Sequence, residues 1–257
     1  MAHQHAASHN MPSMADSEHS SDVRVFATQL TALNSSGVKG AAVLTLDDHV
    51  LTVDIRATGL EADKVHVQHI HGFTDNTDSM SPTIAQDTDH DGFVELAEGL
   101  PKYGPILLNL TSPPTDAAET GMGTFAGTGD LMNFPTAPDG TIRFHQTYTF
   151  DSEEDAAQAL FKTIQNLDNK EIVLHGLTVS GDYGDGTGGE VDGTAGYKAV
   201  LPVASGEIEE ITGTAEADIA MARLKMWQDE MASDGGGHSH DDMGHDMGAM
   251  DHAMGHA

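Results

Sequence analysis

The feature that most constrains the fold is a succession of short segments, rich in β-branched and other apolar residues, between Val23 and Ser205. Turns rich in Gly, Asp, Asn and Pro separate these segments, which read VRVFATQL, AAVLTL, VLTVDIRA, KVHVQHIH, ILLNL, IRFHQTYTF, EIVLHGLTV and YKAVLPV. Short strands with turn residues at this spacing are typical of β-sandwiches and Greek-key barrels. The sequence therefore predicts an all-β Greek-key sandwich over residues 22–212.

Two helical segments interrupt or follow these strands. Residues 152–155, Ser-Glu-Glu-Asp, have the pattern of an N-cap with acidic residues in the first turn, and the apolar residues after them share one helix face: Ala156, Leu160, Ile164 and Leu167. A C-terminal helix is predicted at 213–233, and its apolar stripe consists of Ile219, Ala222, Met226 and Trp227. We expect this stripe to pack on the sandwich.

Both ends of the chain have low complexity. Residues 1–21 hold four histidines, and residues 234–257 combine histidine with methionine. Neither segment has enough apolar residues to fold alone, so both are predicted to be disordered. Imidazole and thioether together suit copper or silver, which makes the tail a candidate metal-binding segment, with a merely solvated tail as the alternative. The candidate ligands of the tail are His238, His240, Met243, His245, Met247, Met250, His252, Met254 and His256.

The charge and the absence of cysteine exclude several classes of protein. With 41 Asp and Glu against 11 Lys and Arg, the net charge is −30, which argues against binding to nucleic acid or to an anionic membrane surface. No apolar run of about 18 residues is present, so no membrane insertion is expected. The first 20 residues lack the pattern of a signal peptide. Because there is no cysteine, a transition metal must be bound by His, Met or carboxylate.

Lys64–Thr77, KVHVQHIHGFTDNT, has the spacing of metal ligands. If this segment is a strand, His69 and His71 lie on one face, about 7 Å apart along the backbone, and both can reach one metal ion. His175, at the end of another apolar segment, is the next candidate. A lone histidine there is more often structural, but together with the H-x-H pair it favours a three-histidine site.

These motifs resemble two known families. HIHGFTDNT, IVLHG, SGDYGDG and GTAGYKAVLPVASGEI resemble, in order and in spacing, the metal-binding strands and loops of Cu,Zn superoxide dismutases. The upstream part of the chain also looks like a bacterial chordin-type (CHRD) domain. The resemblance implies a superoxide dismutase-like or immunoglobulin-like sandwich with His69, His71 and His175 as copper ligands. Lys198 then stands where the dismutases have the arginine that guides superoxide.

The chain departs from the dismutase pattern in several ways. Met80 and Val200 stand near the positions of the two dismutase cysteines, and the histidine-rich zinc loop has no counterpart. These differences imply a site for copper alone. Its fourth ligand is left open between His90, which we rank first, His145, His66 and water.

An acidic motif occupies the place of the zinc loop. Residues 87–98, DTDHDGFVELAE, fit the twelve-residue calcium loop of EF-hands, with candidate ligands Asp87, Asp89, Asp91, Phe93 (through its carbonyl), Glu95 and Glu98. Ser81-Pro82 before the loop and Gly99-Leu100-Pro101 after it argue against flanking helices. We therefore predict an isolated calcium loop inserted in the β-domain, with a solvated acidic loop as the alternative.

Three functions remain open at this point. The first is an extracytoplasmic, periplasmic or secreted copper-binding protein resembling superoxide dismutase, whose turnover of superoxide is undecided. The second is a non-catalytic copper-binding or copper-tolerance protein. The third is a calcium-stabilised surface domain of the CHRD type. The predicted partners are metal ions, with superoxide as the substrate if the site is catalytic.

Overall fold

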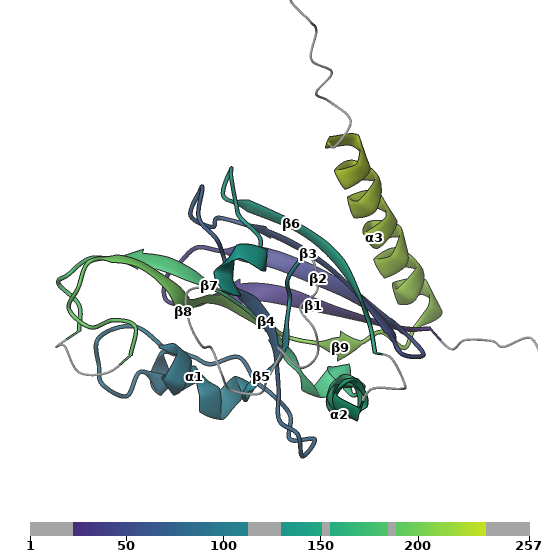
Figure 1. The fold of residues 1–257 in the computed structure, drawn as a ribbon, viewed down its shortest axis with the longest axis horizontal. Coiled ribbons are helices and arrows are strands. Elements are labelled where there is room, and N and C mark those ends of the chain that lie inside the picture. Colours follow the sequence, from purple (N-terminus) through teal and green to yellow (C-terminus); the bar gives the residue numbers. More distant parts are fainter. Residues whose placement is uncertain (1–22, 113–129, 151–154, 185–188, 235–257) are drawn as a thin grey trace, which may run out of the picture.

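The computed structural model describes residues 23–112, 130–150, 155–184 and 189–234, and its strands are all antiparallel (Figure 1). The strands are β1 (Arg24–Ala32), β2 (Lys39–Asp47), β3 (Val50–Thr58), β4 (Gln68–His71), β5 (Ile106–Asn109), β6 (Thr141–Thr149), β7 (Glu171–Val179), β8 (Gly196–Glu207) and β9 (Glu209–Glu210). They are ordered β5-β4-β7-β8-β1-β2-β3-β6, and β9 pairs with β1.

The sheet curls into two halves that meet at β1. This strand pairs with β2 along seven residues, but it pairs with β8 only at Thr31 and Ala32. Apolar side chains from both halves form one buried cluster, including Leu44 and Ile55 from one half and Ile70 and Ile172 from the other. Two sheet halves with a shared core are sandwich-like. The prediction of an all-β, sandwich-like fold is therefore confirmed.

The predicted strands form at the expected places, with one shortened. The segment 64–71 is regular only over its last four residues, because its first half binds another partner: Val65 forms an isolated bridge with Thr136, and the His66 N–H donates to the Pro135 carbonyl. His69 and His71 still share one face of the strand, as predicted, because both lie within β4.

The helices are α1 (Leu96–Tyr103), α2 (Asp155–Ile164) and α3 (Thr214–Asp234), with 3-10 turns η1 (Ile84–Gln86), η2 (Asp130–Asn133) and η3 (Leu167–Asn169). The prediction of α2 is confirmed, although residues 152–154 of its expected cap lie outside the described part. The expectation that no helix adjoins the acidic loop is wrong. Helix α1 runs through Gly99, Leu100 and Pro101, and the N–H of Gly104 still bonds to the Leu100 carbonyl at its end.

The C-terminal helix α3 is confirmed, but its packing face differs from the predicted stripe. Ile219 and Met226 are 62% and 60% exposed, whereas Ala220 and Trp227 pack with Val25 and Val43. Arg56 on β3 adds a hydrogen bond to the Trp227 carbonyl. Figure 1 shows α3 standing along the outside of the sheet.

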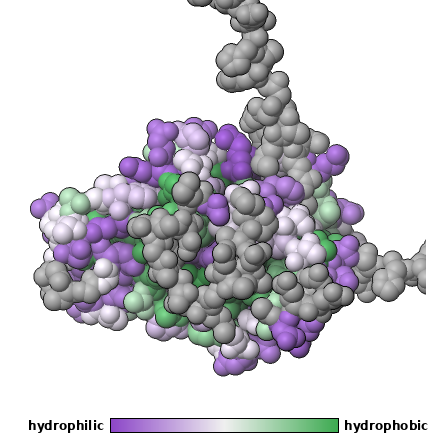
Figure 2. Space-filling model, viewed as in Figure 1, coloured by the Kyte–Doolittle hydropathy of each residue, from purple (hydrophilic) through white to green (hydrophobic). Residues whose placement is uncertain are grey.

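The described surface carries both hydrophilic and hydrophobic residues. Figure 2 shows hydrophilic residues around the edges of one face, with hydrophobic residues in small areas between them. Within the described ranges, none of the helices has the length and apolar character needed to span a membrane.

Candidate metal centre

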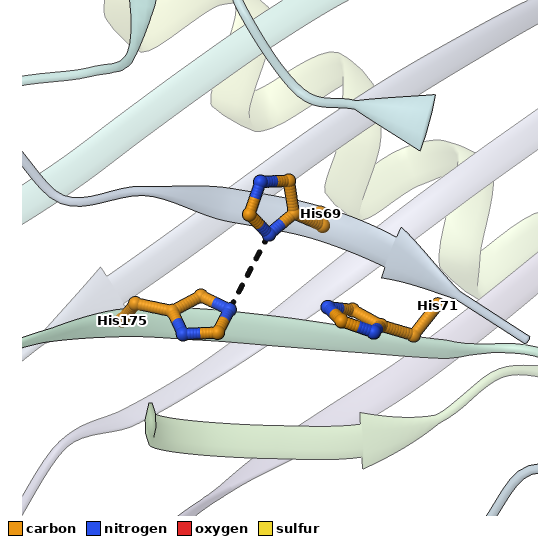
Figure 3. A group of neighbouring side chains, drawn as sticks. All are labelled: His69, His71 and His175. Atoms are coloured by element: carbon orange, nitrogen blue, oxygen red, sulfur yellow. Dashed lines mark hydrogen bonds between the residues drawn. The ribbon is translucent and has the colours of Figure 1, made fainter. Parts of the chain in front are cut away.

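Three histidines from two adjacent strands meet in the interior. His69 and His71 lie on β4, and His175 lies on β7, two residues after Val173, the register partner of His69. Because side chains alternate along strands, all three rings project from the same face. Each ring offers one nitrogen to a group whose members lie within 4.8 Å of one another, and His69 Nδ1 is 3.3 Å from His175 Nε2 (Figure 3). The structure thus brings together the three predicted ligands, called the His triad below.

Backbone carbonyls fix the orientation of two of these rings. His71 Nδ1 lies 2.8 Å from the Gly104 carbonyl, and His175 Nδ1 lies 2.7 Å from the Val200 carbonyl. A carbonyl can only accept, so both Nδ1 atoms carry the proton and both Nε2 atoms keep a lone pair. This is the arrangement that orients metal-binding histidines. His71 Nε2 is buried and has no hydrogen-bond partner among the described residues, as expected of an atom reserved for a metal ion.

The Val200 carbonyl is available because β8 bulges opposite His175. His175 pairs with Pro202, but Leu177 already pairs with Lys198, so β8 has additional residues at this point. A bulge removes residues from the regular ladder of hydrogen bonds. The freed carbonyl of Val200 can then accept from the His175 ring.

Burial keeps the triad neutral. The three side chains are at most 1% exposed, and loss of solvation lowers the pKa of His71 to about 3 and that of His175 to about 4. The pKa of His69 falls well below its ordinary value for the same reason, with a further contribution from the other two rings. Neutral imidazole is the form that binds metal ions. The donor set therefore fits a transition metal, and it contains nitrogen only.

Two aromatic rings cover the triad. The Tyr103 ring, at the end of α1, is 4.6 Å from the His71 ring, and the Phe134 ring is 5.5 Å from that of His69. Tyr103 is fully buried, and its hydroxyl donates to the Leu96 carbonyl. Sequence reasoning missed Tyr103, Phe134 and the two carbonyls, because no local motif marks them.

None of the histidines considered as a fourth ligand joins this group in the part of the chain that the structure covers. His90 is exposed on the acidic loop, with φ of 66°. His145 lies on β6, 2.9 Å from Asp54. Both ring nitrogens of His66 lie against backbone carbonyls, those of His175 and Glu61.

Lys198 is held in an ion pair. Its Nζ donates to Asp192 Oδ1 at 2.7 Å and to Thr194 Oγ1 at 3.0 Å, and its side chain is 14% exposed. The neighbouring ammonium group in turn lowers the pKa of Asp192. Lys198 lies on β8 beside the strand of His175, but Asp192 compensates its charge.

The acidic loop brings three carboxylates together. One oxygen from each of Asp87, Asp89 and Asp91 lies within 4.8 Å of the others. Burial raises the pKa of Asp91, and the neighbouring negative charges of Asp89 and Asp87 raise it further. A cation at this place would relieve that repulsion. One oxygen of Asp91 is buried without a hydrogen-bond partner among the described residues.

The two glutamates of the loop are placed differently. Glu98 accepts hydrogen bonds from the N–H groups of Thr88 and Glu95, and these bonds lower its pKa despite partial burial. Glu95 is 3% exposed, and its carboxylate accepts from the Val191 N–H, outside the aspartate group. Burial raises the pKa of Glu95 to about 7. The structure thus brings together three of the predicted calcium ligands and engages Glu95 elsewhere.

The comparisons with known proteins identify no family. No protein-family model matches the chain, and no curated protein matches it. The predicted ligands in the tail, residues 238–256, lie outside the described residues.

Proposed function

We propose that this protein is an extracytoplasmic copper-binding protein whose copper ion is held by His69, His71 and His175. One observation carries the proposal: the Nδ1 atoms of His71 and His175 donate to backbone carbonyls, so the lone pair of each Nε2 points into the triad, where that of His175 lies 3.3 Å from His69 Nδ1 and is within reach of the same metal ion. Imidazole suits copper, and the resemblance to Cu,Zn superoxide dismutases selects copper among the metals that imidazole binds.

Copper bound by the triad should stabilise the fold, because it links β4 to β7. A ligand present at about 100 times its Kd adds about 2.7 kcal/mol to the unfolding free energy. For a domain of this size that is a rise of roughly 5–10 °C in Tm. The experiment is thermal unfolding of the metal-stripped full chain with and without one equivalent of copper.

Two matched variants distinguish copper bound by the triad from copper bound by the tail. His69→Gln/His71→Gln removes two triad ligands, and His238→Gln/His240→Gln removes two tail histidines. We expect the copper-induced rise in Tm to vanish in the first and to persist in the second. An equal rise in all three proteins would contradict the proposal.

Superoxide dismutation is a second candidate activity, favoured by the position of Lys198 on β8 beside the strand of His175. Bound copper would supply one-electron redox chemistry, and a lysine ammonium would attract the anionic substrate. Since Asp192 compensates that charge, Asp192→Asn should raise the rate of superoxide loss and Lys198→Met should lower it. If no variant removes superoxide faster than free copper does, the activity is excluded. The remaining function is then a non-catalytic copper-binding or copper-tolerance protein, with the tail as an additional metal-binding segment.

We also propose that the acidic loop binds Ca²⁺ through Asp87, Asp89, Asp91 and Glu98, with the Phe93 carbonyl completing the oxygen ligands. The support is the grouping of the three aspartates together with the loop spacing. Millimolar Ca²⁺ should raise Tm, and Asp89→Ala/Glu98→Ala should abolish this rise. If calcium stabilises the protein while the triad binds no copper, the third function, a calcium-stabilised surface domain, takes precedence. Millimolar calcium and copper handling both fit a periplasmic or secreted location.

A further inference from the structure

A cleft separate from the His triad lies on the outside of the sheet. It measures about 410 Å³, and it is lined by parts of β1 and β2, by Ser81, by the end of β8 with β9, and by Arg223 on α3. Ala27 and Ala41 contribute only small side chains, which leaves room for a ligand. The cleft opens where the two sheet halves diverge, between the β1 residues that pair with β8 and those that pair with β9.

Charged groups of both signs line this cleft. Glu207, Glu209 and Arg223 are exposed, and none of them forms an ion pair within the part of the chain that the structure describes. Among the described residues, the Glu207 carboxylate accepts one hydrogen bond, a long one of 3.4 Å from the Ser81 N–H. Two carboxylates with unused acceptor capacity thus line the same cleft as one guanidinium group.

Behind Ser81 lies a buried carboxyl group. Ser81 Oγ donates to Glu171 Oε1 at 2.5 Å and accepts from Ser205 Oγ at 2.9 Å. Glu171 is fully buried, and its Oε2 has no hydrogen-bond partner among the described residues. Burial raises the pKa of Glu171 to about 7. A carboxyl oxygen without a partner is costly to bury, and Ser81, which lines the cleft, lies one hydrogen bond away from this group.

We propose that this cleft binds a small organic compound with a primary ammonium group, held by Glu207, Glu209 and the Ser81 hydroxyl. An ammonium group has three donors, and the two carboxylates and the hydroxyl supply an acceptor for each of them. Arg223 adds a site for a carboxylate on the same compound. Amines and amino acids share the ammonium chemistry, and they differ in whether they engage Arg223.

Putrescine and ornithine form a matched pair of probes, because ornithine has the same diamine chain and carries a carboxylate. Binding to the full chain is measured by calorimetry and by saturation-transfer NMR at 150 mM salt, which screens non-specific attraction to a protein of charge −30. Both probes should bind saturably, and Glu207→Gln/Glu209→Gln should weaken both by at least tenfold. Arg223→Gln should weaken ornithine alone. If Arg223→Gln instead leaves ornithine unchanged, amines rather than amino acids are the source of the ligand.

Asp182→Asn/Asp218→Asn is the control, since it removes two carboxylates that do not line the cleft. It should leave the affinity of both probes within twofold of that of the unmodified protein. The proposal is overturned if neither probe binds saturably, or if the control weakens binding as much as the cleft variant does. Copper binding plays no part in this test, so its outcome is independent of the proposed function.

Discussion

The His triad should make the metal-free protein sensitive to acid, and His71 gives the clearest measure of this effect. Its pKa is about 3 in the folded protein, against an ordinary value of 6.5. The unfolded chain therefore binds more protons than the folded one between these values, so stability is fully present above pH 6.5 and is lost as the pH falls. Each pH unit costs up to about 1.4 kcal/mol, and the loss between pH 6.5 and 4.5 comes to about 2.3 kcal/mol, because the unfolded histidine is only half protonated at pH 6.5.

The perturbation is His71→Gln, which removes the titrating ring and keeps an amide donor for the Gly104 carbonyl. Urea unfolding of the metal-stripped full chain at half-unit steps from pH 8 to 4.5 gives the unfolding free energy of both proteins. Above pH 7 the difference between them should be constant, which serves as the internal control. Between pH 6.5 and 4.5 the variant should lose about 2.3 kcal/mol less than the unmodified protein. Parallel curves over that range would refute the conclusion that His71 is buried in its neutral form.

Three further predictions concern the surroundings of the two candidate metal sites. A Cβ at Gly99 would lie 2.3 Å from the Tyr103 ring. Gly99→Ala should therefore lower the unfolding free energy, measured in urea, by about 1–3 kcal/mol and weaken copper binding. An unchanged urea midpoint would contradict the packing of Tyr103. The Asn34 side chain forms hydrogen bonds with the N–H and the carbonyl of Val94 and with the Pro202 carbonyl. Asn34→Ala should therefore lower the unfolding free energy by about 1–3 kcal/mol and raise the Kd for calcium in a titration. An unaltered Kd would show that the loop is held independently of β8. Ile70→Ala should cost about 2–5 kcal/mol because Ile70 is fully buried in the shared core, and a cost below 1 kcal/mol would contradict its burial.

The triad was accessible from the sequence because it depends on strand periodicity. Two histidines at i and i+2 share a face in any regular strand, and His175 follows an apolar segment that pairs with β4. The supporting contacts were not accessible. The Val200 carbonyl reaches His175 only because β8 bulges, and a bulge leaves no reliable mark in one sequence.

Helix α1 shows where local propensity fails. Gly99 and Pro101 both disfavour a helix interior, and they led to the wrong expectation at this place. Burial of Tyr103 and the capping interactions between Glu95 and Glu98 outweigh that propensity. In α3 the predicted stripe was wrong for another reason: Ala220 and Trp227 pack against Val25 and Val43 of the sheet, while Ile219 remains exposed.

The most direct test of the central claim is X-ray absorption spectroscopy of the single most tightly bound copper equivalent, retained by the full chain against a competing chelator. Copper in the triad should have imidazole nitrogen ligands and no sulfur ligand, since the described triad contains nitrogen donors only. The spectrum should change in His69→Gln/His71→Gln. A sulfur ligand, or a spectrum unaltered by that double substitution, would place the tightest copper outside the triad and contradict the account.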